Sequence, residues 1–188
     1  MSEPLRIAVY GPESTGKTRL AEKLAAHFGA PLVAEYAREL WDRQGALTLE
    51  DMLPVSREQA RREDEAAATC HVLRDKPAGA NSLVVCDTDA LTTMLWSDLL
   101  YGTAPDELRR SAEQRCRNYA LYLLLDIDVP FAPDPQRCFP DPADREKCMR
   151  VWRGALERRR LPCVEIRGNW AERERAAIAA VDEILGQH

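Results

Sequence analysis

The stretch YGPESTGKT, residues 10–18, stands between an apolar run and an amphipathic segment and fits the spacing G-x-x-x-x-G-K-[ST]. Gly11 and Gly16 allow the backbone to curl so that successive N–H groups face one anion. A helix that begins near Lys17 directs the positive end of its dipole at the same point. With a strand before it and a helical repeat after it, the stretch predicts a cradle for the phosphates of a nucleoside triphosphate.

The residues of this cradle have separate expected tasks. The Lys17 ammonium would reach the β- and γ-phosphates, and the Thr18 hydroxyl would bind Mg²⁺. ATP is favoured over GTP because the chain has no NKxD-like motif for guanine. The expected nucleotide-binding residues are Gly11, Glu13, Ser14, Thr15, Gly16, Lys17 and Thr18.

The rest of the chain alternates between apolar runs and amphipathic segments. Strands are expected at 5–10, 32–34, 83–86, 122–125 and 163–166. Helices are expected at 17–28, 35–44, 56–76, 90–101, 105–117, 143–159 and 170–185. This alternation predicts an α/β fold of the P-loop NTPase class, a five-stranded parallel sheet with helices on both faces and a small lid. The length and the lack of a linker predict one domain over residues 1–188.

Composition narrows the class of function. The net charge of −5 argues against a broad nucleic-acid-binding face. The chain has no apolar run of membrane-spanning length and its start lacks a signal-peptide pattern, so we expect a cytoplasmic protein. None of the six cysteines is spaced as CxxC, so free thiols are expected rather than a zinc site. The charged stretch at 61–69 is interpreted as the solvated face of a helix.

Ligands of open parallel sheets bind beyond the carboxyl ends of the strands, so the residues that follow the second strand are candidates. Glu35 could accept a proton from a substrate hydroxyl, or it could simply stabilise the positive end of the helix dipole. Tyr36 and Arg38 follow it, and Arg38 could hold a substrate or phosphate oxygen.

The third strand ends in Asp87-Thr88-Asp89. An acid directly after an apolar strand is the pattern of the Walker B residue, so Asp87 is the expected Mg²⁺ ligand beside Thr18. Asp89 could share this role or accept the proton in place of Glu35, and it could instead cap the next helix.

Residues 130–147, rich in proline and aspartate, follow the fourth strand, where small P-loop kinases carry a lid. Arginines in a lid neutralise charge and exclude water from the transferring phosphoryl group. Arg137 and Arg145 are the candidates, with solvated surface arginines as the alternative.

Together these motifs resemble the ribosylnicotinamide-kinase domain of NadR-type proteins. They are GPESTGKT, EYARE at 35–39, CDTD with TTMLW at 86–96, the Tyr101-Gly102 pair and the D-x-x-R of the lid. The resemblance implies a P-loop kinase that uses ATP and Mg²⁺ to phosphorylate the 5′-hydroxyl of nicotinamide riboside, a small-molecule substrate. It also implies an acceptor end formed by Glu35, Arg38, Asp87 and Asp89, and a lid that carries Arg137 and Arg145.

The chain departs from this family at the aromatic residues that stack on the nicotinamide ring. The family places one aromatic directly before the Glu of the E-Y motif, where this chain has Ala34, and one on the long helix, where 59–64 has none. Aromatic side chains that could replace them are Tyr36, Trp41, Trp96 and Tyr101, of which Tyr36 and Trp96 are expected substrate ligands. The alternative functions are a P-loop ATPase that acts as a nucleotide-dependent switch or has a non-nucleoside acceptor, and a protein that binds nucleotide without catalysis.

Overall fold

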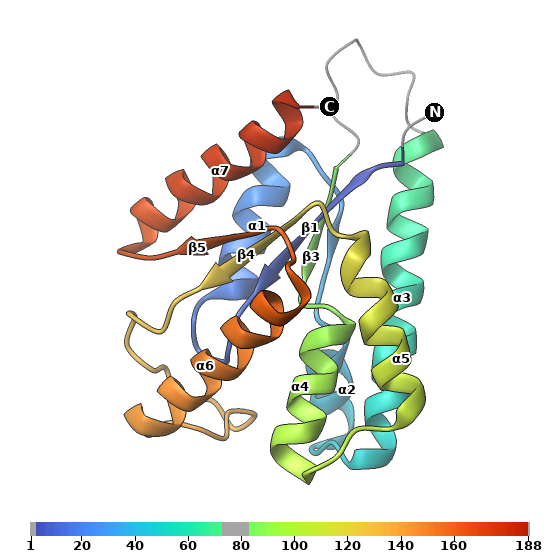
Figure 1. Ribbon diagram of the computed structural model, residues 1–188, viewed down its shortest axis with the longest axis vertical. Coiled ribbons are helices and arrows are strands. Elements are labelled where there is room, and N and C mark those ends of the chain that lie inside the picture. The colour runs from blue at the N-terminus through green and yellow to red at the C-terminus, as the bar shows by residue number, and fades with distance from the viewer. Residues whose placement is uncertain (1–2, 73–82, 188) are drawn as a thin grey trace.

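Five parallel strands lie side by side in the order β2-β3-β1-β4-β5 (Figure 1). The structure is a computed structural model that describes residues 3–72 and 83–187. The strands are β1 (Leu5–Tyr10), β2 (Leu32–Val33), β3 (Leu83–Asp87), β4 (Leu121–Leu125) and β5 (Cys163–Ile166). All five predicted strands are present, with bounds that differ from the prediction by at most one residue.

Helices cover both faces of this sheet, as the alternation of the sequence predicted. They are α1 (Lys17–Phe28), α2 (Tyr36–Gln44), α3 (Leu49–Val72), α4 (Ala90–Tyr101), α5 (Asp106–Arg115), α6 (Pro142–Arg159) and α7 (Trp170–Gly186), with the 3-10 turn η1 (Cys116–Asn118) after α5. Apolar residues of α1 and α7 pack on one face, and those of α3, α4, α5 and α6 pack on the other. Within the described parts of the chain, no helix is long and apolar enough to cross a membrane.

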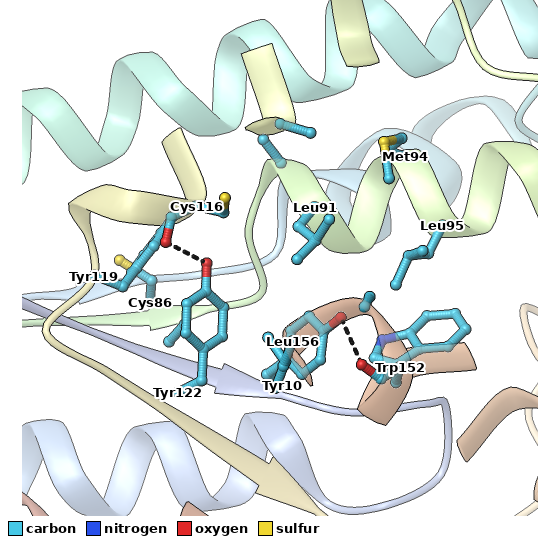
Figure 2. Packing of buried hydrophobic residues seen from close by; sticks show 14 of the residues in the cluster. Tyr10, Cys86, Leu91, Met94, Leu95, Cys116, Tyr119, Tyr122, Trp152 and Leu156 are labelled. Carbon is cyan, nitrogen blue, oxygen red and sulfur yellow. Dashed lines mark hydrogen bonds between the residues drawn. The ribbon is translucent and has the colours of Figure 1, made fainter. Parts of the chain in front are cut away.

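The face under α4 and α6 carries tyrosines as well as aliphatic residues (Figure 2). The rings of Tyr10 and Tyr122 meet edge to face at 5.3 Å between centroids. Their hydroxyls are buried but paired, since Tyr10 donates to the Trp152 carbonyl at 3.3 Å and Tyr122 donates to the Asp89 carboxylate at 2.9 Å, with the Cys116 carbonyl also near, at 3.2 Å. The sheet therefore buries polar atoms without leaving these hydroxyls unsatisfied.

Helix α3 begins at Leu49, seven residues before the predicted start at 56. The Asp51 carboxylate accepts from the Thr48 backbone N–H at 2.7 Å and from the Thr48 hydroxyl at 2.8 Å, which stabilises an earlier first turn. The helix then runs through Pro54, although proline cannot donate the i→i−4 hydrogen bond. The predicted end at 76 lies outside the described residues.

The interpretation of 61–69 as a solvated helix face was wrong at Glu63, which is 1% exposed. Its carboxylate accepts from the Tyr119 hydroxyl at 2.8 Å and from the Arg115 guanidinium at 3.1 Å. Tertiary contacts between α3 and the end of α5 thus bury one acid of a charged run, and burial raises the pKa of Glu63.

We expect Glu63→Ala to lower the free energy of unfolding by about 2 to 4 kcal/mol, because it leaves Tyr119 and Arg115 without their buried partner. Chemical denaturation measures this loss. Asp64→Ala is the matched control, since Asp64 pairs with the same Arg115 but its side chain is 52% exposed, and we expect a loss below about 1 kcal/mol. Equal losses in the two variants would contradict this account of the burial.

Candidate active site

The loop between β1 and α1 curls as the glycines predicted. Gly11 and Gly16 have φ angles of 145° and 85°, and Ser14 between them has a φ of 58°. A Cβ at Gly11 would lie 2.9 Å from the Leu125 carbonyl oxygen, and one at Gly16 would collide with the Trp170 ring. The curled backbone and the close neighbours therefore both require glycine at these two positions.

Hydrogen bonds inside the loop hold this shape. The Thr15 hydroxyl and the Lys17 ammonium both donate to the Pro12 carbonyl at 2.9 Å. Lys17 is the first residue of α1, so the lysine charge and the positive end of the helix dipole are both found where this loop ends.

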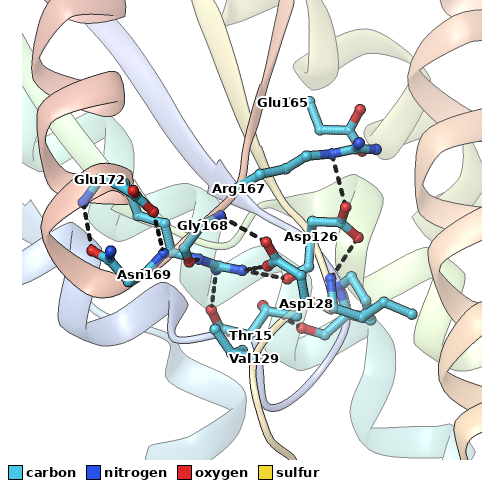
Figure 3. A network of polar contacts seen from close by, with 12 residues as sticks. Thr15, Asp126, Asp128, Val129, Glu165, Arg167, Gly168, Asn169 and Glu172 are labelled. Atoms are coloured by element: carbon cyan, nitrogen blue, oxygen red, sulfur yellow. Dashed lines mark hydrogen bonds and ion pairs between the residues drawn. The ribbon is translucent and has the colours of Figure 1, made fainter.

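A buried arginine that the sequence did not single out supports the loop from behind. Arg173 of α7 is 1% exposed and donates to the carbonyls of Thr15 at 2.9 Å, Asp126 at 2.9 Å and Gly168 at 2.8 Å, and it pairs with Asp128. Figure 3 shows these partners gathered from the phosphate loop, the end of β4 and the start of α7. A charged residue in the run AERERAA looks solvated, so only the fold reveals this role.

A cavity of about 640 Å³ lies against the loop. One side is formed by residues 13–18 of the loop, which are all of the predicted nucleotide ligands except Gly11. Gly11 does not line the cavity, because its backbone lies against Leu125. The other side is formed by α2, α3 and α4, and residues from the β4–α6 segment also contribute. One continuous space thus joins the phosphate cradle to the surface where an acceptor would bind.

Two acids lie beside Lys17 at the ends of neighbouring strands. Glu35 is half-buried, lines the cavity and precedes the first residue of α2. Burial raises its pKa, and Lys17 opposes this shift. Asp87 ends β3 and is 1% exposed, and burial likewise raises its pKa against the effects of Lys17 and of a hydrogen bond from Thr18.

Thr18 and Asp87 fit the predicted Mg²⁺ site. Asp87 does not line the cavity, contrary to its expected place among the substrate ligands, whereas Thr18 does. Asp87 Oδ1 is buried and has no hydrogen-bond partner among the described residues, so a cation bound beside Thr18 would satisfy this oxygen. A hydroxyl beside a single carboxylate is a donor set that suits Mg²⁺, which usually keeps waters and takes further ligands from phosphate. The described part of the chain has no group of three or more His, Cys, Asp or Glu side chains that could hold a metal ion.

Asp89 does not line the cavity, contrary to its expected place among the substrate ligands. It is fully buried, and its carboxylate accepts from the Thr92 backbone N–H at 2.8 Å and from the Tyr122 hydroxyl at 2.9 Å. Of the alternatives that the sequence left open, the structure shows the cap of α4.

Tyr36 also lies outside the cavity wall. Its ring stacks against the guanidinium of Arg62 at 4.5 Å, and its hydroxyl accepts from Arg43 at 3.0 Å. Two later residues of α2, Arg38 and Trp41, do line the cavity. The helix period, which turns Tyr36 away when Arg38 and Trp41 face inward, is the physical reason.

Aromatic side chains instead reach the cavity from later elements. Trp41, Trp96 and Tyr101 line its far side together with apolar residues of α3 and α4. Phe139 of the β4–α6 segment lies nearly parallel to Trp96, with 6.0 Å between ring centroids. Three of the four aromatic candidates that the sequence offered therefore line the same cavity, and we call the part of the cavity that they line the aromatic chamber (Trp41, Trp96 and Tyr101).

The β4–α6 segment is fastened to the phosphate loop. The Glu13 carboxylate accepts from the backbone N–H groups of Cys138 at 3.0 Å and Phe139 at 2.6 Å. The Ser14 hydroxyl accepts from the Ala132 backbone N–H at 2.8 Å and from Arg137 at 3.3 Å. These bonds attach residues 132–139, part of the segment predicted as a lid, to the phosphate loop.

The same segment is tied to α2 across the cavity. Arg38 pairs with Asp134 at 2.7 Å, and the Gln136 amide donates to Asp42 at 2.8 Å. Arg137 lines the cavity as predicted for a lid arginine. Arg145 does not line it and donates to the Val129 carbonyl at 3.0 Å, because it lies within α6, at the base of the segment.

Thr88 is a further cavity residue that sequence reasoning missed. Its φ of 88° is unusual for a β-branched residue, and its buried hydroxyl has no partner in the described structure. Strained backbone often marks a functional site, and Thr88 stands directly after the acid Asp87. Its residue type carries no signal of this conformation.

Comparisons with known proteins place this chain in a protein family. The AAA domain family matches residues 6–173, so the chain belongs to that family. No match exists among curated protein sequences. Among solved structures, the NadR protein in complex with NR is 24% identical with a TM-score of 0.72, and the match covers 97% of this chain and 52% of the NadR chain.

Two further structures agree with this fold. NadR in complex with NAD and AMP-PNP is 25% identical with a TM-score of 0.69, and the match covers 97% of this chain and 50% of that one. Thymidylate kinase from Ehrlichia chaffeensis is 14% identical with a TM-score of 0.63, at 96% and 100% coverage. The chain spans about half the length of the NadR structures. The fold is that of a P-loop NTPase, and the similarity to the NadR structures extends over almost the whole of this chain.

We expect Glu13→Ala to loosen the lid, because the backbone N–H groups of Cys138 and Phe139 lose their acceptor. Limited trypsin digestion, followed by mass spectrometry, should show cleavage after Arg137 at least about threefold faster than in the unmodified protein. Glu50→Ala, an exposed acid on α3, is the control. Identical cleavage rates would show that Glu13 does not hold the segment.

Proposed function

We propose that this chain is an ATP-dependent small-molecule kinase that transfers the γ-phosphate of ATP to the 5′-hydroxyl of nicotinamide riboside or a related nucleoside. The observation that carries the proposal is the single cavity that joins the phosphate loop to the aromatic chamber, with Glu35 at its wall. We propose residues 1–188 as one kinase domain and 130–147 as its lid.

The proposed roles follow from the geometry. Lys17 and the N–H groups of the loop bind and orient the phosphates of ATP, while Thr18 and Asp87 hold Mg²⁺. The metal, when bound, neutralises charge on the phosphate oxygens. Glu35 accepts the proton of the acceptor hydroxyl as its oxygen bonds to the γ-phosphorus and ADP leaves.

Two arginines complete this arrangement. Arg137 contacts the phosphate loop through Ser14, and Arg38 reaches from α2 to Asp134 of the lid. Positive charge at these places stabilises the transferring phosphoryl group, and the closed segment keeps water away from it. Exclusion of water is what separates a kinase from an ATPase of the same fold.

The aromatic chamber supports a pyridinium nucleoside as the acceptor. Trp and Tyr faces attract a cation without the desolvation cost of a buried carboxylate. Trp41, Trp96 and Tyr101 could thus replace the aromatic residues that the family carries at the positions of Ala34 and 59–64. NadR, the similar structure with a TM-score of 0.72, was solved in complex with NR.

Release of ADP from Mg-ATP, measured with a series of nucleosides and without any acceptor, tests the proposal. We expect nicotinamide riboside to stimulate release at least about tenfold above the acceptor-free rate, because the acceptor hydroxyl replaces water. Stimulation by another nucleoside alone would keep the kinase and change the substrate. Turnover that ignores every acceptor would point to the ATPase.

We expect Glu35→Gln to lower kcat by about 10²- to 10⁴-fold while the KM for ATP stays nearly unchanged, because the amide cannot accept the proton. Burial raises the pKa of Glu35, so as the pH is lowered the carboxylate should become protonated, and activity should be lost, at a pH above the ordinary carboxyl pKa of 4.5. A Glu35→Gln variant that loses only ATP affinity would exclude Glu35 as the base.

Lys17→Ala should abolish turnover with an unchanged circular dichroism spectrum.

A further inference from the structure

One buried amide in the cavity wall has a donor without an acceptor. Gln59 of α3 is 1% exposed and lines the cavity. Its Oε1 accepts from the backbone N–H of Tyr36 at 3.0 Å. Its Nε2 is buried and has no hydrogen-bond partner within residues 3–72 and 83–187.

The orientation of this amide is determined by its neighbour. The backbone N–H of Tyr36 can only donate, so the oxygen of the Gln59 amide must face it. Turning the amide over would set two donors against each other. The NH₂ group therefore keeps its present position, and its two donors need an acceptor from outside the described chain.

The same face of α3 forms the wall of the acceptor end. Met52 and Val55 line the cavity seven and four residues before Gln59, which are the spacings of one helix face. Both are buried and apolar, so Gln59 is the polar position on an apolar stripe. Trp41 and Trp96 line the same cavity.

We infer that Gln59 is a specificity-determining residue whose Nε2 donates a hydrogen bond to an oxygen on the ring substituent of the acceptor. This inference rests on the proposed kinase function and deepens it. The substrate class it names is a ribosylated aromatic ring that carries a carboxamide or carboxylate, and a ring without such an oxygen leaves the donor unpaired. A buried donor without a partner is costly, so the pocket discriminates against the bare ring.

The test compares two acceptors that differ only in the carboxamide that carries this oxygen, nicotinamide riboside and unsubstituted ribosylpyridinium. For the unmodified protein we expect kcat/KM to be at least about tenfold higher with nicotinamide riboside. In Gln59→Glu this ratio should fall to one or below, because the carboxylate still accepts from Tyr36 but offers no donor. The KM for ATP should not change.

Ser56→Ala is the matched control. Ser56 lies one turn earlier on α3, is equally buried at 1% exposure and also has an unpartnered polar atom among the described residues, but it does not line the cavity. We expect it to keep the full ratio. Gln59→Met, which has similar length and no donor, replaces Gln59→Glu if that variant does not fold.

The outcomes separate this inference from the proposed function. Turnover of both acceptors with a ratio near one in the unmodified protein would overturn the role of Gln59 and leave the kinase intact. A full ratio in the folded Gln59 variant would overturn it as well. Turnover of neither acceptor would overturn the proposed substrate, and the inference with it.

Discussion

The parallel register of three central strands is the constraint on which the site depends. Val9 of β1 pairs with Asp87 of β3, and Tyr10 pairs with Leu124 of β4, so the three strands end at one edge of the sheet. The phosphate loop follows the end of β1, Asp87 is the last residue of β3, and the segment that leads to α6 follows the end of β4. A shift by one residue would turn Asp87 to the opposite face and away from Thr18.

Buried polar contacts then hold the chain that leaves this edge. Arg173 binds the carbonyls of Thr15 and Asp126, so the loop cannot move independently of β4. On its other side, Glu13 accepts from the backbone of the lid. The Arg173 contacts satisfy a buried guanidinium, whereas the Glu13 contacts lie nearer the surface, and together they fasten the phosphate loop on two sides.

The cavity divides its chemistry between two ends. Charged groups gather at the phosphate loop, where phosphoryl transfer needs positioning and neutralisation of charge. Tryptophan, tyrosine and aliphatic side chains gather at the other end, with the amide of Gln59 as a polar feature of the α3 wall. Glu35 lines the same cavity, where the proposed transfer of a proton from an acceptor hydroxyl would need a base.

By itself the sequence determined the sheet, the phosphate loop and the positions of Glu35 and Asp87, because these depend on local periodicity and on residues next to strand ends. Only the tertiary structure decided that Asp89 caps a helix, that Tyr36 faces two arginines and that Glu63 and Arg173 are buried. The partners of these side chains include groups 33 to 158 residues away along the chain. Spacing within one segment shows which face a residue occupies, whereas its partner is set by the packing of distant elements.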